Sequence, residues 1–204
     1  KTVEEADVVF FEGGADVPPD LYGDKMGQHT YNSTHADRNE AFAYAEAIKH
    51  NKIMLGTCKG MQLFSAYAGG KLVQDMDHPG GHGMTTKDGK KFRINSLHHQ
   101  CVNPYMLPKE DYEILAVSDV KSKKHLNGDN EDISEEIKDD IEAIYFPKIK
   151  AIGWQFHPEF MWNNNPENPL FQWLYTQIEE KTGLKVNPIE DAELIEEETN
   201  SINL

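Results

Sequence analysis

Cysteine, histidine and glutamate, residue types that can cleave amide bonds when they act together, each follow an apolar segment of this 204-residue sequence. Cys58 lies in Gly56-Thr57-Cys58-Lys59-Gly60, between a short apolar run and an apolar-periodic segment at 61–68. A strand–turn–helix with glycines on both sides of the central residue is the pattern of a nucleophile elbow, here with sulfur in place of oxygen. Such a turn pushes the side chain outward, and the helix N-terminus favours the thiolate. We therefore predict an exposed, reactive thiol that attacks a carbonyl carbon.

The base and its orienting carboxylate are predicted in His157-Pro158-Glu159, which follows an apolar strand at 151–156. In extended backbone, residues two apart point to the same face, and Pro158 prevents a helix there. We predict that His157 carries the proton to the leaving nitrogen. Glu159 would fix the tautomer of the imidazole and stabilise the imidazolium.

Each of these motifs has a simpler interpretation when it is taken alone. A lone cysteine is usually an inert small hydrophobe, His-Pro-Glu is common in surface loops, and Gly13-Gly14 after the strand at 7–11 is only a turn. All three nevertheless follow predicted strands, where open α/β sheets place their sites. Their joint occurrence favours catalysis, with the Lys59 N–H and an N–H of the Gly13-Gly14 turn as donors to an oxyanion.

Histidine pairs invite a metal-binding interpretation, which the spacing does not support. His78 and His82 are separated by Pro79-Gly80-Gly81, which breaks a helix, and no Cys-x-x-Cys or His-Glu-x-x-His occurs. We predict no metal and no cofactor. The second pair lies in the polar run 95–100, which is either an ordinary loop or a substrate-recognition strand.

Strands that alternate with helices in the first half predict an α/β fold with a parallel sheet and helices on both faces. Helices are expected at 34–50, directly after Cys58, and from Asn168-Pro169 to Gly183. Short strands at 71–73, 91–94 and 112–117 predict a small antiparallel region. We expect one domain at 1–186 with a charged, exposed insertion at 119–140, followed by an acidic tail at 187–204.

The composition limits the class of partner and the compartment. The net charge of −15 argues against a nucleic-acid surface, which depends on Lys and Arg. No apolar run reaches the roughly 18 to 20 residues of a membrane span, and no signal peptide opens the sequence. With only two cysteines, this pattern predicts a cytoplasmic protein without a membrane partner.

In their order and spacing, these motifs resemble those of the class I glutamine amidotransferase-like superfamily. The likeness is greatest to its γ-glutamyl hydrolase and γ-glutamyl-γ-aminobutyrate hydrolase branch, the peptidase C26-like proteins. It covers about residues 7–176 and rests on four segments: Gly13 to Gly23, Gly56 to Gln62, Asn95 to Gln100 and Gly153 to Glu159. The resemblance implies a flavodoxin-like, open and mostly parallel sheet, and hydrolysis of a γ-glutamyl amide through a thioester on Cys58.

The resemblance also implies roles for further residues. The amides of Gly14 and Lys59 would form the oxyanion hole. The γ-glutamyl group would be bound by Gly13, Gln62, Ser96, His98 and Gln100. The strand–helix–strand unit that precedes the Gly-Gly loop in the family is expected to be reduced or absent here.

Two other functions stay open at this stage. The chain could be a glutaminase subunit that delivers ammonia to a synthetase on a separate chain, or a catalytically inactive binding module on the same fold. A homo-oligomer is compatible with all three functions.

Overall fold

The computed structural model describes residues 2–31, 34–77, 80–161 and 167–186. It divides into two compact units, Lys1–Phe160 and Met161–Leu204. The predicted single domain at 1–186 stays a prediction, and the acidic tail at 187–204 lies outside the described residues. Within these ranges, no helix combines the length and apolar character that a membrane span requires.

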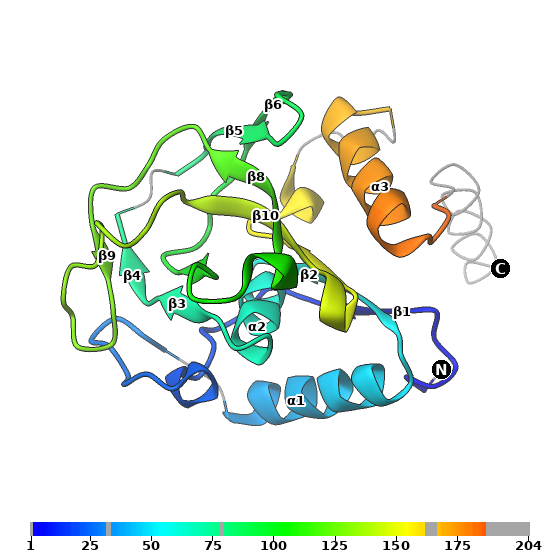
Figure 1. Ribbon diagram of the computed structural model, residues 1–204, viewed down its shortest axis with the longest axis horizontal. Coiled ribbons are helices and arrows are strands. Elements are labelled where there is room, and N and C mark those ends of the chain that lie inside the picture. The colour runs from blue at the N-terminus through cyan, green and yellow to red at the C-terminus, as the bar shows by residue number, and fades with distance from the viewer. Residues whose placement is uncertain (1, 32–33, 78–79, 162–166, 187–204) are drawn as a thin grey trace, which may run out of the picture. The chain divides into compact units, whose positions relative to one another are not determined.

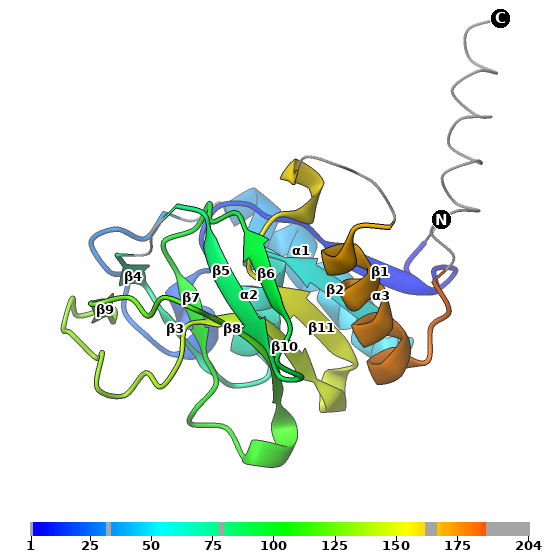
Figure 2. The same ribbon diagram turned by 90° about the horizontal axis from the view of Figure 1, so that it is seen from above.

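A mixed sheet of seven strands forms the centre of the first unit (Figure 1). In spatial order its strands are β1 (Val8–Phe11), β2 (Ile53–Thr57), β11 (Ala151–Trp154), β10 (Ile141–Phe146), β8 (Glu113–Ser118), β5 (His82–Thr86) and β6 (Lys91–Ile94). Figure 2 shows the strands from above. The predicted α/β class is thereby confirmed.

Parallel pairing joins β1, β2 and β11, the strands that carry the Gly13-Gly14, Cys58 and His157 segments at their ends. The other four pairings, from β11 through β10, β8 and β5 to β6, are antiparallel. The antiparallel region is therefore larger than the small one expected. Two further antiparallel pairs lie outside the sheet: β3 (Lys71–Val73) with β7 (Cys101–Asn103), and β4 (Asp75–Met76) with β9 (His125–Leu126).

Two helices of the first unit pack against one apolar core. They are α1 (Thr34–Lys49) and α2 (Lys59–Tyr67), and Figure 1 shows both on the same side of β1 and β2. Ala47 of α1 and Phe64 of α2 belong to the same buried cluster as Phe11 of β1 and Met54 of β2. The prediction of helices on both faces stays a prediction, since the third helix belongs to the second unit.

That third helix is α3 (Pro169–Thr182), and its ends match the sequence signals. The Asn168 side chain accepts a hydrogen bond from the backbone N–H of Leu170, and Gly183 adopts the left-handed conformation of a helix C-cap. One-turn 3-10 helices complete the described elements: η1 (Pro19–Tyr22), η2 (Lys109–Asp111), η3 (Pro147–Ile149) and η4 (Pro158–Phe160).

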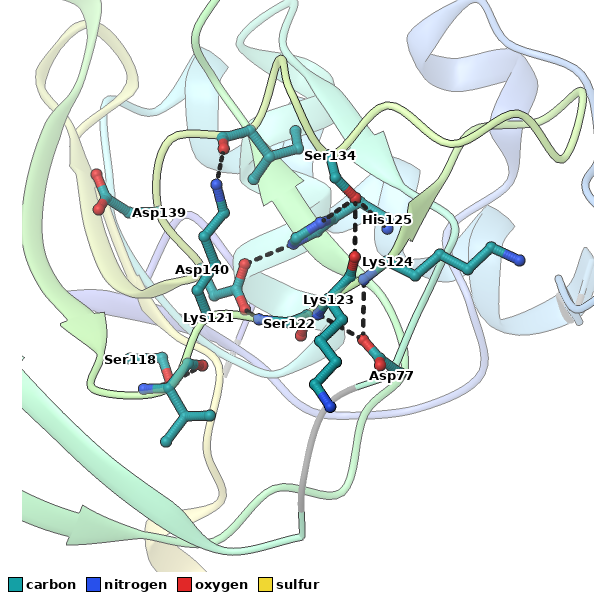
Figure 3. Close-up of polar contacts among 12 residues, drawn as sticks. Asp77, Ser118, Lys121, Ser122, Lys123, Lys124, His125, Ser134, Asp139 and Asp140 are labelled. Atoms are coloured by element: carbon teal, nitrogen blue, oxygen red, sulfur yellow. Dashed lines mark hydrogen bonds and ion pairs between the residues drawn. The ribbon is translucent and has the colours of Figure 1, made fainter.

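The charged insertion at 119–140 is not fully exposed: its strand β9 pairs with β4, and it has a buried centre of its own. His125 is completely buried, and its imidazole binds Asp140 at 2.7 Å through Nε2 and Ser134 at 3.1 Å through Nδ1 (Figure 3). Asp140 also accepts the backbone N–H of Ser122. The serine, histidine and aspartate resemble a catalytic triad in type, but a substrate cannot reach a histidine with no exposed surface. They stabilise the insertion.

Candidate active site

The Cys58 segment has the strand–turn–helix geometry that the sequence predicts for a nucleophile elbow. Cys58 joins β2 to α2 with φ 49° and ψ −107°, a strained conformation for a residue with a side chain. Its glycine neighbours are required by close packing. A methyl group on Gly56 would lie 2.6 Å from Phe64 Cε2, and one on Gly60 would collide with the backbone of Phe11. The sharp turn therefore depends on both glycines.

His157 and Glu159 make the predicted contact, although their backbone differs from the prediction. His157 Nδ1 and Glu159 Oε1 are 2.6 Å apart. Strand β11 ends at Trp154, and Glu159 lies in the 3-10 turn η4 instead of in extended chain. The tight turn after Pro158 brings the two side chains together. With Nδ1 held by the carboxylate, Nε2 is the nitrogen left for proton transfer.

Gly13 lies where the side chains of Cys58 and His157 come together. A methyl group on Gly13 would lie 3.3 Å from His157 Nε2 and 3.5 Å from Cys58 Cβ. Two hydrogen bonds fasten the nucleophile segment to the base segment: Cys58 N–H donates to Trp154 O, and Thr57 Oγ1 donates to Phe156 O, each at 2.8 Å. The three predicted motifs therefore converge at the ends of β1, β2 and β11.

The thiol itself differs from the prediction. Cys58 is 6% exposed instead of open to solvent. Burial raises the pKa of this thiol to about 11, against the opposing effect of the Lys59 backbone N–H, and the carboxylates of Asp16 and Glu159 raise it further. The predicted thiolate is thus not the resting form at neutral pH, because desolvation outweighs the helix N-terminus. A base must remove the proton before Cys58 can attack.

The two predicted oxyanion donors are neighbours. A methyl group on Gly14 would touch the Lys59 side chain at 3.4 Å. The amide of Lys59 begins α2 and interacts with the Cys58 sulfur. That both amides bind an oxyanion stays a prediction.

Three of the residues predicted to bind the γ-glutamyl group form one connected cluster. Gln62 Nε2 donates to the backbone O of Gln100 at 3.1 Å and to Gln155 Oε1 at 3.3 Å. His98 Nδ1 contacts the same Gln100 oxygen at 2.9 Å. Their segment, 95–100, is irregular rather than a strand, and Ser96 is half-buried in it. The structure brings these residues together, while their contact with a substrate stays a prediction.

A cavity of about 590 Å³ lies elsewhere in the first unit, between β3, β7 and the insertion, and Asp24, Tyr105 and Glu136 are among the residues that line it. Of the described residues, none that we predicted for the site contributes to this cavity. Within the described ranges, no group of three or more His, Cys, Asp or Glu is placed to hold a metal ion. His78 lies outside these ranges.

The sequence did not reveal the role of the Lys59 side chain. This ammonium group is almost fully buried and binds Asp37 at 2.9 Å and Glu40 at 2.8 Å, both on α1. Their side chains are 11% and 22% exposed. Because Lys59 follows the nucleophile directly, this cluster ties the start of α2 to α1.

His99 was also missed as part of the site. Its Nε2 contacts both carboxylate oxygens of Asp16, and its Nδ1 contacts Asp75 Oδ1, all at 3.2 Å. Asp16 follows Gly13 and Gly14 in the same loop, and also accepts the backbone N–H of Tyr31. The hydrogen bond to Asp16 is the largest cause that raises the pKa of His99, against the opposing effect of burial. His99 therefore holds the loop that borders the nucleophile.

This bridge gives the protein a pH-dependent stability that a His99→Gln substitution should remove. Because the folded pKa lies above the unfolded value of about 6.5, the contribution is fully present below that pH and is lost as pH rises through the raised pKa. We expect the stability difference between the wild type and the variant to shrink as pH increases from about 6 to 9. Urea unfolding of both proteins across this pH range measures the difference in the free energy of unfolding. A difference that does not change with pH would contradict a stabilising contact between His99 and Asp16.

Known proteins are similar to this chain in sequence and in fold. Residues 1–88 match the model of the Peptidase C26 family. A glutamine amidotransferase-like protein YvdE homologue of Lactococcus lactis subsp. cremoris is 31% identical, over 47% of this chain and 63% of its own length. Protein NtpR of Enterococcus hirae is 26% identical, over 80% of this chain and 71% of its own length.

Solved structures agree on the fold. A glutamine amidotransferase from Thermotoga maritima matches 98% of this chain and 75% of its own chain, with a TM-score of 0.52 and 18% identity. The glutaminase domain of CTPS from Trypanosoma brucei, solved with bound acivicin, matches 91% of this chain and 74% of its own, with a TM-score of 0.53 and 16% identity.

The chain is therefore similar in sequence to Peptidase C26 and glutamine amidotransferase-like proteins, and similar in fold to a solved glutamine amidotransferase. It spans 63% and 50% of the length of its two Lactococcus lactis relatives.

Proposed function

We propose that this protein hydrolyses a γ-glutamyl amide through a γ-glutamyl thioester on Cys58, with His157 as proton carrier and Glu159 as its orienting carboxylate. The observation that supports this most is the convergence at Gly13, where His157 Nε2 and Cys58 border the same point while Nδ1 is held at 2.6 Å by Glu159. The family-level matches support the same chemistry.

The first half of the reaction transfers the γ-glutamyl group to sulfur. His157 Nε2 takes the Cys58 proton as the sulfur bonds to the γ-carbonyl carbon, and the amides of Gly14 and Lys59 bind the oxyanion that forms. When the carbonyl re-forms, the C–N bond breaks and His157 gives its proton to the leaving nitrogen. An amine leaves, and the thioester remains.

The second half returns the enzyme to its resting form. Water gives a proton to His157 and attacks the thioester carbon, the C–S bond breaks, and His157 returns the proton to the sulfur. The sum is an amide plus water giving glutamate plus an amine. The high pKa of the thiol makes His157 necessary in the first step, because little thiolate exists at neutral pH without it.

A diazoketone analogue of glutamine tests the nucleophile. The sulfur attacks the diazo carbon as that carbon gains a proton, dinitrogen leaves, and a stable thioether forms. We expect mass spectrometry to find one adduct on Cys58, formed faster as pH rises, and none in Cys58→Ala. The matched control is Cys101→Ala, because Cys101 is also free but is 1% exposed, and it should label like the wild type. Undiminished labelling of Cys58→Ala would exclude the proposal.

Turnover assays separate the proposed hydrolase from its alternatives. Release of glutamate and amine by the isolated protein, measured across γ-glutamyl amides including glutamine, supports the hydrolase. Glutamine hydrolysis that requires an added synthetase would indicate the ammonia-delivering subunit. Binding of these amides without turnover under either condition would indicate the inactive module. A cytoplasmic location and a homo-oligomer stay predictions.

A further inference from the structure

Asn95 makes two hydrogen bonds to the backbone of a single distant residue, His157. The residue follows β6, the edge strand of the sheet farthest from β1. Its Nδ2 donates to the carbonyl O of His157 at 2.7 Å, and its Oδ1 accepts the backbone N–H of His157 at 2.8 Å. One side-chain amide therefore engages both polar backbone groups of the residue that we propose as the proton carrier.

The position of His157 makes these bonds important. His157 is 8% exposed, lies after the end of β11 and before η4, and so has no strand ladder to pair its backbone. Buried backbone groups need partners, and leaving one unpaired costs on the order of 1–3 kcal/mol. The Asn95 amide supplies the donor and the acceptor that a neighbouring strand would otherwise give.

Few other side chains can make this pair of contacts. An ionised aspartate offers acceptors only, and an alanine offers neither group. Glutamine carries the same amide one methylene farther from the backbone. Asn95 itself is half-buried, and both its amide nitrogen and its amide oxygen are bonded to His157.

Other contacts of His157 come from its own segment: the backbone N–H of Phe160 donates to the His157 carbonyl O at 3.2 Å, and two side chains contact the ring. Glu159 binds Nδ1 from a side chain that is 47% exposed, and the Phe160 ring stacks on the imidazole with a centroid distance of 5.3 Å. Both partners follow His157 within three residues and move with the same segment. Asn95 is separated from it by 62 residues and belongs to a different part of the sheet.

We propose that Asn95 is a positioning residue that sets the location of His157 Nε2 relative to the Cys58 sulfur. This proposal rests on the proposed function, because it assigns Asn95 to the proton carrier of that reaction. Displacement of a catalytic group by about 1 Å can cost about 100-fold in rate. We expect Asn95→Ala to lower kcat for a γ-glutamyl amide by about 10- to 100-fold, with KM changed less than threefold.

The substitution Asn95→Asp distinguishes positioning from a general structural role. At neutral pH its carboxylate repels the His157 carbonyl, and the rate loss should be at least as large as in Asn95→Ala. A protonated carboxyl has one donor and one acceptor in nearly the geometry of the amide. The loss relative to wild type in the rate of Cys58 labelling by the diazoketone should therefore shrink as pH falls from about 7 to 5. In Asn95→Ala it should not shrink.

Control variants show whether a loss of labelling is specific to Asn95 or follows from a general loss of structure. Asn127→Ala removes an asparagine that organises a turn of the insertion through Asp129 N–H and Glu131 N–H, and should leave labelling within twofold of wild type. Circular dichroism establishes that each variant is folded at the assay temperature. If Asn95→Ala does not fold, Asn95→Ser, which keeps one of the two contacts, takes its place with an expected intermediate loss.

Two results would be decisive. The positioning role alone would be overturned if both Asn95→Ala and Asn95→Asp kept labelling rates and kcat within twofold of wild type. It would also be overturned if the loss of labelling rate in Asn95→Asp did not change with pH. If Cys58→Ala and His157→Gln also kept wild-type labelling, the proposed function itself would fail.

Discussion

Gly13→Ala is expected to lower kcat by about 10²- to 10⁴-fold, the range over which a positioned general base contributes to catalysis. The added methyl group would lie 2.5 Å from His157 Cε1, closer than side-chain carbons approach one another. Gly13 does not have a left-handed backbone, so the substitution acts through the methyl group and not through φ. The imidazole has to move away from the place where it meets Cys58.

The ring has little freedom to move without losing its alignment. Glu159 holds Nδ1, Phe160 stacks on one face, and Asn95 binds the backbone. Overpacking of this kind typically costs about 1–3 kcal/mol of stability, which leaves a folded protein for assay. The expected result is therefore a large loss of turnover and of Cys58 labelling, with a modest loss of stability in urea unfolding.

Gly14→Ala is the matched control for this prediction. Its methyl group would meet Lys59 Cδ at 3.4 Å, an ordinary contact, and alanine keeps the backbone N–H. We expect this variant to retain at least about a tenth of wild-type kcat, because its methyl group does not displace the His157 imidazole and so causes no loss of rate through misalignment. Equal losses in the two variants would mean that the Gly-Gly loop, rather than the His157 contact, limits the rate.

The sequence was sufficient to predict the parts of the site that depend on local structure. The elbow at Cys58 is defined within five residues, and Gly56 is required by packing against α2, which follows directly. The contact between His157 and Glu159 involves residues two apart. Helix boundaries near 34, 49, 168 and 183 also follow local signals.

The parts that were missed depend on residues far apart in the chain. Strand β5 follows a Pro-Gly-Gly turn signal and is identified only by its pairing with β6 and β8. The pKa of Cys58 depends on burial, which no local pattern gives, and a helix start alone predicts the opposite direction. Asn95 and His157 are 62 residues apart, so their contact has no local signal.

Lys59 lies in a buried cluster of charges that the sequence did not reveal. The substitution Lys59→Met is expected to lower the free energy of unfolding by about 2–4 kcal/mol. Breaking a buried ion pair by removing one partner typically costs about 3–5 kcal/mol, and the partial exposure of Asp37 and Glu40 reduces this. Lys49→Met is the matched control on α1. Lys49 is 63% exposed and binds Glu46 at 3.0 Å, and its loss should cost less than about 0.5 kcal/mol.

The pH dependence of this loss in the free energy of unfolding identifies its cause. Burial raises the pKa of Glu40, and Lys59 is the group that opposes this, so its removal raises that pKa further. A carboxyl whose folded pKa exceeds its unfolded value destabilises the fold by the full penalty above the folded pKa, and the penalty is relieved as pH falls through the folded pKa towards the unfolded value. The gap between Lys59→Met and wild type in urea unfolding should therefore narrow from about pH 7 to pH 5. A gap that stays constant would mean that Lys59→Met loses stability through the packing of the lysine stem and not through unpaired carboxylates. The stem, rather than the ion pairs, would then hold α2 and Cys58 in place.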